Sequence, residues 1–348
     1  MFGKQNRVVG LDIGSSEIKA LEMQKFGDGY AITGFASTRV HSPDETRAAI
    51  QEVIATGGFR TRRVVTAVSG RSVIVRYVNM PRMAPDQLRS AVRYEADKYI
   101  PFEVEDVVLD CQVLEPETAP TEGEQPEMKV LLVAVKKSLI EEHVALLSDC
   151  NLTPAVIDVD AFALGNAFEL HVTASHRERE FEDRVVALID IGANKTNINI
   201  VRGGNSYFTR EVYLAGNDFT EAIARRLGID EEEAEALKCE PRDRVGEVEE
   251  CILPTLDDLG NEIQLSFDYF ENQFEREVEE VYVSGGSAKL PGLARTFEAS
   301  FDRPIIFWDP LENLPIRSDR IDEKAMLARS NQLAVVVGLA SRVRGKLT

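Results

Sequence analysis

The sequence predicts an α/β protein with two like-folded halves and a smaller α/β insert in the first half. An apolar run followed by an Asp-x-Gly turn occurs twice, at Asp12-Ile13-Gly14 and at Asp190-Ile191-Gly192. The two copies are separated by about half of the 348 residues. A repeat at half-length indicates two similar domains that face each other. The hydrophobic content of 44% is ample for packed cores.

Composition excludes several classes of function. The formal net charge of −19 argues against a nucleic-acid partner, because phosphates must be neutralised by Lys and Arg. Four scattered cysteines without a C-x-x-C pair argue against a cysteine metal site. Nothing resembles a signal peptide, and no apolar run approaches the roughly 20 residues of a membrane-spanning helix. We therefore expect a cytoplasmic protein with no direct membrane insertion.

The first half reads as a sheet with flanking helices. The expected elements are a strand, turn and strand over 7–23 with the turn at 14–16, a strand at 30–40, a helix at 42–57, a strand at 64–68, and helices at 138–148 and 161–170. Residues 175–184 are nearly all charged and predict a hinge or an exposed helix end.

The insert occupies residues 72 to about 135. A strand at 72–80 precedes a helix that begins at Pro85, since proline suits a first helical turn. Two more strands are expected at 107–114 and 128–135, around a loop at 115–127 that is rich in Pro, Glu and Gly. The expected first domain is 1–175, with core 1–71 and 136–175; the second is 185–348, whose final helix, 333–344, packs back on the first.

The second half repeats the opening strand, turn and strand over 185–201. Helices are expected at 218–227, 231–238 and 256–277. The longest helix carries a single apolar face: Leu259, Ile263, Phe267, Phe270 and Phe274. A strand at 281–283 ends in Gly285-Gly286, where the backbone could pass close under a flat purine.

The paired turns suit a phosphate clamp. Glycine at each turn lets backbone N–H groups approach an anion closely. Asp12 and Asp190 can hold Mg²⁺ through water, because Mg²⁺ keeps several waters and takes one or two carboxylates. Hydrogen-bond donors and positive charge for phosphate oxygens come from Ser15, Ser16, Asn194, Thr196, Lys19 and Lys195. A single Asp-x-Gly is most often a plain β-turn, so the matched pair carries the inference.

These motifs, in this order, resemble the actin/Hsp70/sugar-kinase superfamily over nearly the whole chain. The matching segments are a first phosphate loop at 12–19, a connecting helix at 158–168, a second phosphate loop at 190–196, an adenosine motif at 283–288 and a second connecting helix at 333–341. The resemblance implies an actin-like (ribonuclease H-like) two-domain ATPase fold with ATP and Mg²⁺ in the cleft. The implied nucleotide-binding residues are Gly14, Ser15, Ser16, Lys19, Gly192, Ala193, Asn194, Lys195, Thr196, Gly216, Lys238, Glu240, Gly285, Gly286 and Ser287. Among them, Lys238 and Glu240 take the places of ribose and adenine contacts in bacterial actins such as MreB.

Within the superfamily, longer matches are similar to the PilM family of type IV pilus assembly proteins, relatives of the cell-division protein FtsA. They lie at 78–83, 94–102, 109–114 and 158–163, and the early insert is FtsA-like in position. The resemblance implies ATP binding and a role in pilus biogenesis and twitching motility.

It also implies a partner, the cytoplasmic N-terminal peptide of the membrane protein PilN, gripped between the first-domain core and the insert. Other components of the pilus inner-membrane complex are further implied partners. PilN would recruit the protein to the inner face of the inner membrane. The candidate peptide-binding residues are Met80, Pro81, Tyr99, Ile100, Pro101 and Phe102. Packing within the insert core is the alternative for each residue of 99–102.

Efficient ATP hydrolysis is not expected. The connecting helix offers Asp158 and Asp160 as alternatives for positioning water. The second loop has Ala193-Asn194-Lys195 in place of glycines, which restricts backbone approach, so we expect slow or no turnover. An FtsA-like filament former and a sugar-kinase-like phosphotransferase stay open as alternatives, as does a homo-oligomer. The insert lacks an obvious sugar site, and 341–348 offers little apolar surface for a membrane.

Overall fold

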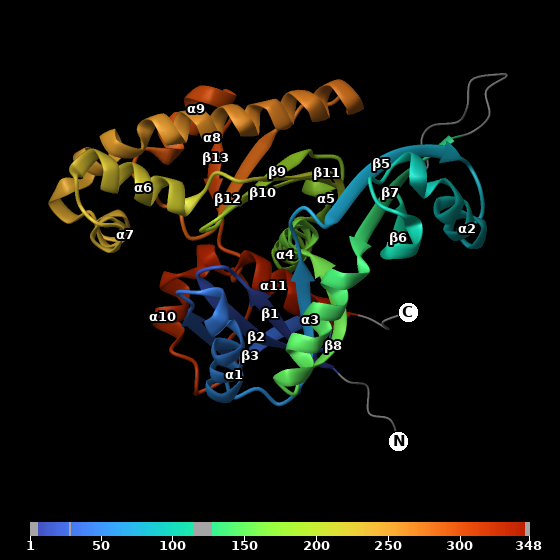
Figure 1. Ribbon diagram of the computed structural model, residues 1–348, viewed down its shortest axis with the longest axis horizontal. Coiled ribbons are helices and arrows are strands. Elements are labelled where there is room, and N and C mark those ends of the chain that lie inside the picture. Colours follow the sequence, from blue (N-terminus) through green and yellow to red (C-terminus); the bar gives the residue numbers. More distant parts are fainter. Residues whose placement is uncertain (1–5, 28, 115–126, 345–348) are drawn as a thin grey trace.

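The computed structural model describes residues 6–27, 29–114 and 127–344. The loop expected at 115–127 lies outside these residues except for Glu127, which begins a strand. The described chain forms two five-stranded sheets and one three-stranded sheet (Figure 1).

The first sheet has the order β3-β2-β1-β4-β8. Its strands are β1 (Arg7–Ile13), β2 (Glu17–Phe26), β3 (Gly29–Arg39), β4 (Arg63–Val68) and β8 (Thr153–Val159). The first three are antiparallel, and β4 and β8 extend the sheet in parallel with β1.

The second sheet repeats this plan as β11-β10-β9-β12-β13. Its strands are β9 (Val186–Ile191), β10 (Thr196–Arg202), β11 (Asn205–Val212), β12 (Glu280–Ser284) and β13 (Ile305–Phe307). The antiparallel and parallel pairings follow in the same sequence, so the half-length repeat is also a repeat of topology. The sequence had not predicted β11 and β13, the two edge strands of this sheet, or β8, an edge strand of the first sheet.

Helices cover both sheets. They are α1 (Thr46–Thr56), α3 (Lys137–Asp149), α4 (Asp160–Ala174), α5 (Glu178–Phe181), α6 (Gly216–Leu227), α7 (Glu231–Cys239), α8 (Val245–Phe274), α9 (Leu293–Phe301), α10 (Glu323–Ala328) and α11 (Ala334–Ala340). The long α8 begins well before its expected start and continues through Pro254, and its predicted apolar face is buried from Leu259 to Phe270. None of the described helices is long and apolar enough to cross a membrane.

Two helices lie between the sheets. Figure 1 shows α4 and α11 side by side in the centre of the molecule, and α11 packs on both α4 and β1. The crossing is close: a Cβ on Gly338 would lie 1.7 Å from the Ala163 carbonyl oxygen. The apolar cluster around this crossing contains residues of both sheets and of the segment after β13, including Leu21, Leu188 and Trp308.

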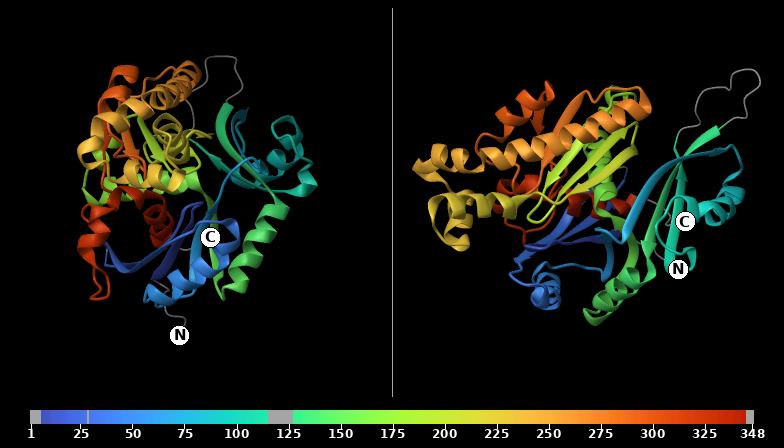
Figure 2. Two further views of the ribbon diagram at one scale, coloured as in Figure 1. Left: turned by 60° about the vertical axis from the view of Figure 1, so that its left-hand side comes forward. Right: turned by 45° about the horizontal axis from the view of Figure 1, so that its top comes forward.

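The insert is a separate layer at one side of the molecule (Figure 2). It contains β5 (Val73–Pro81), α2 (Pro85–Glu95), β6 (Val107–Val113) and β7 (Glu127–Lys136), with strand order β5-β7-β6. Its own apolar core joins α2 to one face of the sheet through Leu88, Val92 and Val130. We propose the expected domain boundaries on this basis, with α11 assigned to the second domain although it packs on the first sheet.

The α4–α11 crossing makes a stability prediction. Gly338→Ala should lower the free energy of unfolding by about 1–3 kcal/mol, because the added methyl group forces two packed helices apart. Urea unfolding followed by circular dichroism measures the change. Gly246→Ala is the matched control, since a Cβ on that helical glycine would have no atom within 4 Å and the variant should lose nothing. Equal midpoints for the two variants would contradict the close crossing.

Candidate functional site

The first Asp-x-Gly turn holds an ion pair. Asp12 near the end of β1 lies opposite Lys19 of β2, and the Lys19 Nζ is 3.0 Å from Asp12 Oδ2. Burial works to lower the pKa of Lys19, but the carboxylates of Asp12, Glu17 and Asp190 outweigh it and raise the pKa above its ordinary value. The lysine is therefore held charged at the mouth of the turn.

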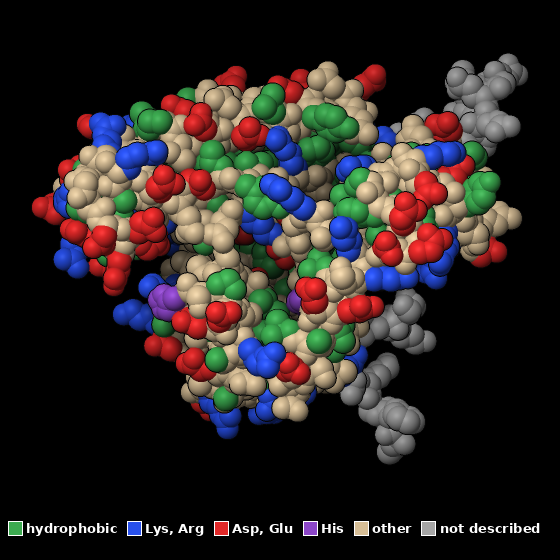
Figure 3. Space-filling view, viewed as in Figure 1, with side chains coloured by type: hydrophobic (Ala, Val, Ile, Leu, Met, Phe, Trp, Pro, Cys, Tyr) green, Lys and Arg blue, Asp and Glu red, His purple; other side chains and the backbone are tan. Residues whose placement is uncertain are grey.

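The second turn contains a buried carboxyl group, Asp190, whose charged form is disfavoured. Asp190 accepts a hydrogen bond of 2.8 Å from Ser284 Oγ. Burial raises the pKa of Asp190 to about 6; Ser284 and Lys19 oppose the rise, while Asp12 and Asp160 add to it. Charges of the first turn therefore lie close enough to the second turn to act on the Asp190 carboxyl group. Figure 3 shows the surface hollowed between the corresponding halves of the molecule.

The two aspartates at the start of the connecting helix face different ways. Asp158 accepts hydrogen bonds from the Val159 N–H and from Asn166 Nδ2, and its Oδ2 is 3.4 Å from the guanidinium of Arg342. Asp160 instead binds Lys195 of the second turn at 2.7 Å. Of the two aspartates named as alternatives for positioning water, Asp160 is the one whose carboxylate contacts a residue of the second turn.

Residues of the second turn are partly committed to other contacts. Thr196 is fully buried and its hydroxyl donates to the Leu214 carbonyl at 2.8 Å. It therefore does not face the hollow between the halves, although the sequence analysis expected it to donate to a phosphate oxygen there. Asn194 Oδ1 accepts from Asn217 Nδ2 at 2.5 Å. Lys195 Nζ lies 2.7 Å from Asp160 and 3.1 Å from Glu211, and so carries the positive charge of this turn.

Three predicted glycine positions meet behind the second turn. A Cβ on Gly216 would lie 2.9 Å from the Gly192 carbonyl and 2.8 Å from Ser287 Oγ. Gly285 has φ of +101°, and a Cβ there would lie 2.3 Å from the Ile191 carbonyl. The structure thus brings Gly192, Gly216 and 285–287 together, with no space for a side chain larger than hydrogen at the two crossing points.

The predicted adenosine contacts are less direct. Lys238 Nζ donates to the Gly216 carbonyl at 2.8 Å and pairs with Glu235 at 2.6 Å. Its ammonium group therefore fixes α7 to the start of α6. Glu240 is exposed and lies 3.3 Å from Arg242.

Several residues of the site were missed by the sequence analysis. Asn331 exchanges two hydrogen bonds with the backbone of Gly285, at 2.7 and 2.8 Å, and holds the glycine turn from the C-terminal segment. Ser284 and Glu211 are the other two. Asn331 and Glu211 belong to no recognisable motif, whereas Ser284 lies within the expected adenosine motif at 283–288, directly before Gly285-Gly286, but was not singled out.

The predicted peptide-binding residues do not form one patch. Met80 and Ile100 are only 2% and 6% exposed and pack inside the insert, as in the core-packing alternative. Pro81 and Met80 pair with residues 127 and 128 of β7, whereas the Phe102 ring lies under Lys136, 4.5 Å from its Nζ. These two positions are about 27 Å apart along the strand. The region expected at 80–102 is therefore split between the two ends of the insert.

The end with Phe102 adjoins the first-domain core. Lys137, the first residue of α3, donates to the Glu105 carbonyl, and α3 packs beside both β7 and β8. Both β6 and β8 are edge strands of their sheets. Exposed apolar side chains lie on this side of the insert and on α3, with Val108 47% and Val144 37% exposed.

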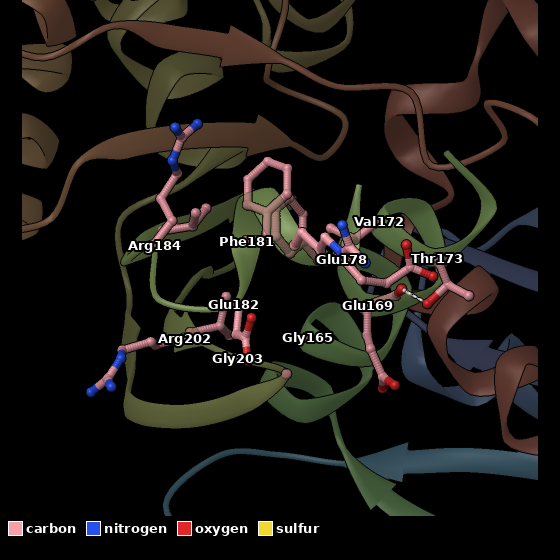
Figure 4. Close-up of a pocket in the computed structure, with 15 residues that line it drawn as sticks. Gly165, Glu169, Val172, Thr173, Glu178, Phe181, Glu182, Arg184, Arg202 and Gly203 are labelled. Atoms are coloured by element: carbon pink, nitrogen blue, oxygen red, sulfur yellow. Dashed lines mark hydrogen bonds between the residues drawn. The ribbon is translucent and has the colours of Figure 1, made fainter. Parts of the chain in front are cut away.

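A cavity of about 420 Å³ lies elsewhere, at the C-terminal half of α4. Figure 4 shows it between α4, α5 and the β10–β11 turn, with Phe181 and Val172 among its walls and charged groups of both signs around it. None of the sequence-predicted site residues lines it.

Comparison with known proteins agrees with this geometry. The family model for type IV pilus assembly protein PilM matches residues 10–344. A solved chain from a "PilM-PilN type IV pilus biogenesis complex" is 32% identical, with 97% of this chain and 98% of that chain covered and a TM-score of 0.83.

Two more distant structures share the fold alone. The ethanolamine utilization protein EutJ from Carboxydothermus hydrogenoformans is 15% identical, with coverage of 96% and 89% and a TM-score of 0.54. MreB5 of Spiroplasma citri, solved with AMPPNP bound, is 12% identical, with coverage of 96% and 95% and a TM-score of 0.52. The expected actin-like fold is confirmed, and the chain belongs to the PilM family of type IV pilus assembly proteins.

Proposed function

We propose that the protein is an ATP-binding cytoplasmic scaffold of the pilus inner-membrane complex and that it holds the N-terminal cytoplasmic peptide of a PilN-type membrane protein. Membership of the PilM family, with 32% identity to a chain from a PilM–PilN complex, carries the proposal. The peptide would recruit the protein to the inner face of the inner membrane.

The charges between the two turns support a Mg-nucleotide. Four carboxylates, of Asp12, Asp160, Asp190 and Glu211, interact there with the two ammonium groups of Lys19 and Lys195. The excess of acidic groups suits a divalent cation, which the fold would hold through Asp12 and Asp190 by way of water. When bound, Mg²⁺ would supply charge neutralisation for the phosphates, and the two lysines would orient them.

The same contacts favour holding ATP over hydrolysing it. Asp160, the candidate for positioning water that contacts the second turn, is bound by Lys195, and the larger residues of the second turn limit backbone approach to the phosphates. A ligand that bridges the two halves stabilises them by about 4 kcal/mol at a thousandfold excess over its Kd. We therefore propose ATP as a structural or switching ligand.

The peptide would lie where the insert meets the first-domain core. An extended peptide can add to an exposed strand edge and place alternate side chains in apolar pockets. The edges of β6 and β8, beside Phe102 and the exposed Val108 and Val144, offer both features. Of the predicted residues, Tyr99, Pro101 and Phe102 belong to this end of the insert.

Removing the ammonium group of Lys19 at the first turn should weaken nucleotide binding. Lys19→Ala should raise the Kd for Mg-ATP at least tenfold, because it removes one of the two ammonium groups that face the phosphates. Isothermal titration of the folded variant measures the constant. Lys25→Ala, on the same strand but away from the turn, is the control and should bind like wild type; equal weakening in both would contradict the assignment.

Asp190 makes the nucleotide-free protein sensitive to pH. Because burial raises its pKa from 3.8 to about 6, the folded state holds this proton more tightly than the unfolded chain, and the resulting stability is lost as the pH rises through 6. From pH 4.5 to 7, the free energy of unfolding of wild type should fall by about 2 kcal/mol relative to Asp190→Asn. Chemical denaturation at each pH measures this. The exposed Asp44→Asn should run parallel to wild type; a flat difference between wild type and Asp190→Asn would refute the prediction.

The peptide site has its own test. Val108→Glu and Val144→Glu should each weaken binding at least tenfold to a labelled synthetic peptide of the PilN cytoplasmic N-terminus, because each buries a charge against the peptide. Fluorescence anisotropy gives the affinity. Tyr94→Glu is the matched control, since Tyr94 is 88% exposed on α2. If Val108→Glu and Val144→Glu bind like wild type, or if Tyr94→Glu weakens binding equally, this placement of the peptide is wrong.

A further inference from the structure

The insert is attached to the first-domain core through a short segment that contains Gly70. This residue lies between β4 and β5, has φ of +90°, and its carbonyl accepts a 2.9 Å hydrogen bond from Val73, the first residue of β5. Its N–H donates in the other direction, to both carboxylate oxygens of Glu211, at 3.1 and 3.0 Å. A residue of the second sheet therefore holds the junction at which the insert begins.

The same carboxylate also contacts the second phosphate turn. Lys195 Nζ donates to Glu211 Oε1 at 3.1 Å and to Asp160 Oδ2 at 2.7 Å. Tyr213 adds a hydrogen bond of 3.2 Å to Glu211 Oε2. Side chains of Lys195, Glu211 and Asp160 are each about one-fifth exposed, so these contacts form in a partly desolvated space where charge interactions are strong.

Lys195 thus pairs with two carboxylates, those of Asp160 and Glu211, at the proposed phosphate-binding site. A phosphate oxygen competes for Lys195 with Glu211 and Asp160, and its own negative charge repels both carboxylates. Asp160 is fixed at the start of α4, whereas Glu211 is on the edge strand β11 and has a backbone N–H as one of its partners. The weaker attachment of Glu211 to Lys195, 3.1 Å against 2.7 Å, makes it the carboxylate to be displaced.

We infer that Glu211 is a positioning residue that links the phosphate turns to the insert: nucleotide at Lys195 weakens its hold on Gly70. The inference rests on the proposed ATP site and adds a regulatory contact to it. The insert would remain attached to the second half through a broader contact, where Leu131 packs in the apolar core of the second half and the Tyr77 hydroxyl lies 3.3 Å from Ser206 Oγ. Release of Gly70 with this contact kept would free the start of β5 from the second half and change the cleft between the insert and β8.

Hydrogen exchange at the junction tests the link. In wild type, saturating Mg-ATP should speed exchange of the Gly70 amide about tenfold, as expected for a lost hydrogen bond to a charged acceptor. Mass spectrometry of overlapping peptides across 66–75 resolves this amide. Glu211→Gln keeps an acceptor for Gly70 but removes the charge that responds to Lys195, so exchange should be slow with and without ATP. Glu211→Ala removes the acceptor, so exchange should be fast in both conditions.

ATP affinity supplies a second readout that structural damage would not imitate. Since coupling is reciprocal, both Glu211 variants should bind Mg-ATP about three- to tenfold more tightly than wild type. Glu262→Gln is the control, because Glu262 pairs with Arg210 on the same strand as Glu211, at 2.5 Å, and is not a partner of Lys195. It should match wild type in both measurements.

The outcomes separate the two proposals. If wild type binds no Mg-ATP, the proposed function fails and the link fails with it. If wild type binds Mg-ATP but exchange at Gly70 is unchanged, or if Glu211→Gln responds to ATP as wild type does, the link alone is overturned.

Discussion

Uncompensated negative charge between two facing turns is the constraint on which the rest of the structure depends. The repeat of strand order brings Asp12 and Asp190 to equivalent ends of two sheets, and α4 adds Asp160 between them. Two lysines are too few to balance these groups, and the burial that raises the pKa of Asp190 is one sign of the imbalance. Because like charges repel, the cluster stays in place only if the surrounding structure is rigid. The buried hairpins, the close glycine contacts behind the second turn and the α4–α11 contact provide this rigidity.

The sequence was sufficient for features that depend on local pattern. The two turns, the apolar face of α8 and the strand at 281–283 are set by residues close together in the chain, and each was predicted within a few positions. The edge strands β11 and β13 were missed because half-exposed edge residues lack a strong alternation. The length of α8 was underestimated, because the helix begins at Val245 and the packing of buried Val248 and Ile252 carries it through Pro254.

Side-chain partners across long distances were beyond the sequence. Asp158 and Asp160 lie two residues apart in the same short segment. Their different partners, Arg342 for Asp158 and Lys195 for Asp160, distinguish them only in the folded structure. Glu211 and Asn331 belong to no motif, because their importance comes from backbone groups of Gly70 and Gly285 that are distant in the chain. The separation of Met80 from Phe102 follows from the register of β5 and β6 on β7, which no local pattern in the insert specifies.

The position of the insert places it in contact with both the proposed nucleotide site and the proposed peptide site. Its sheet meets the second half through an apolar contact that includes Tyr77 and Phe274, and its junction meets the second half through Glu211 and Gly70. The insert is therefore linked to Glu211, a charged group in the cleft, through Gly70. Through this link it can respond to charge in the cleft without rearrangement of either five-stranded sheet. Hydrolysis is unnecessary for the proposed response, since arrival of the phosphates alone would change the partners of Lys195. The substitution of larger residues for glycines in the second turn is consistent with a site whose occupancy, and not its turnover, matters to the partner.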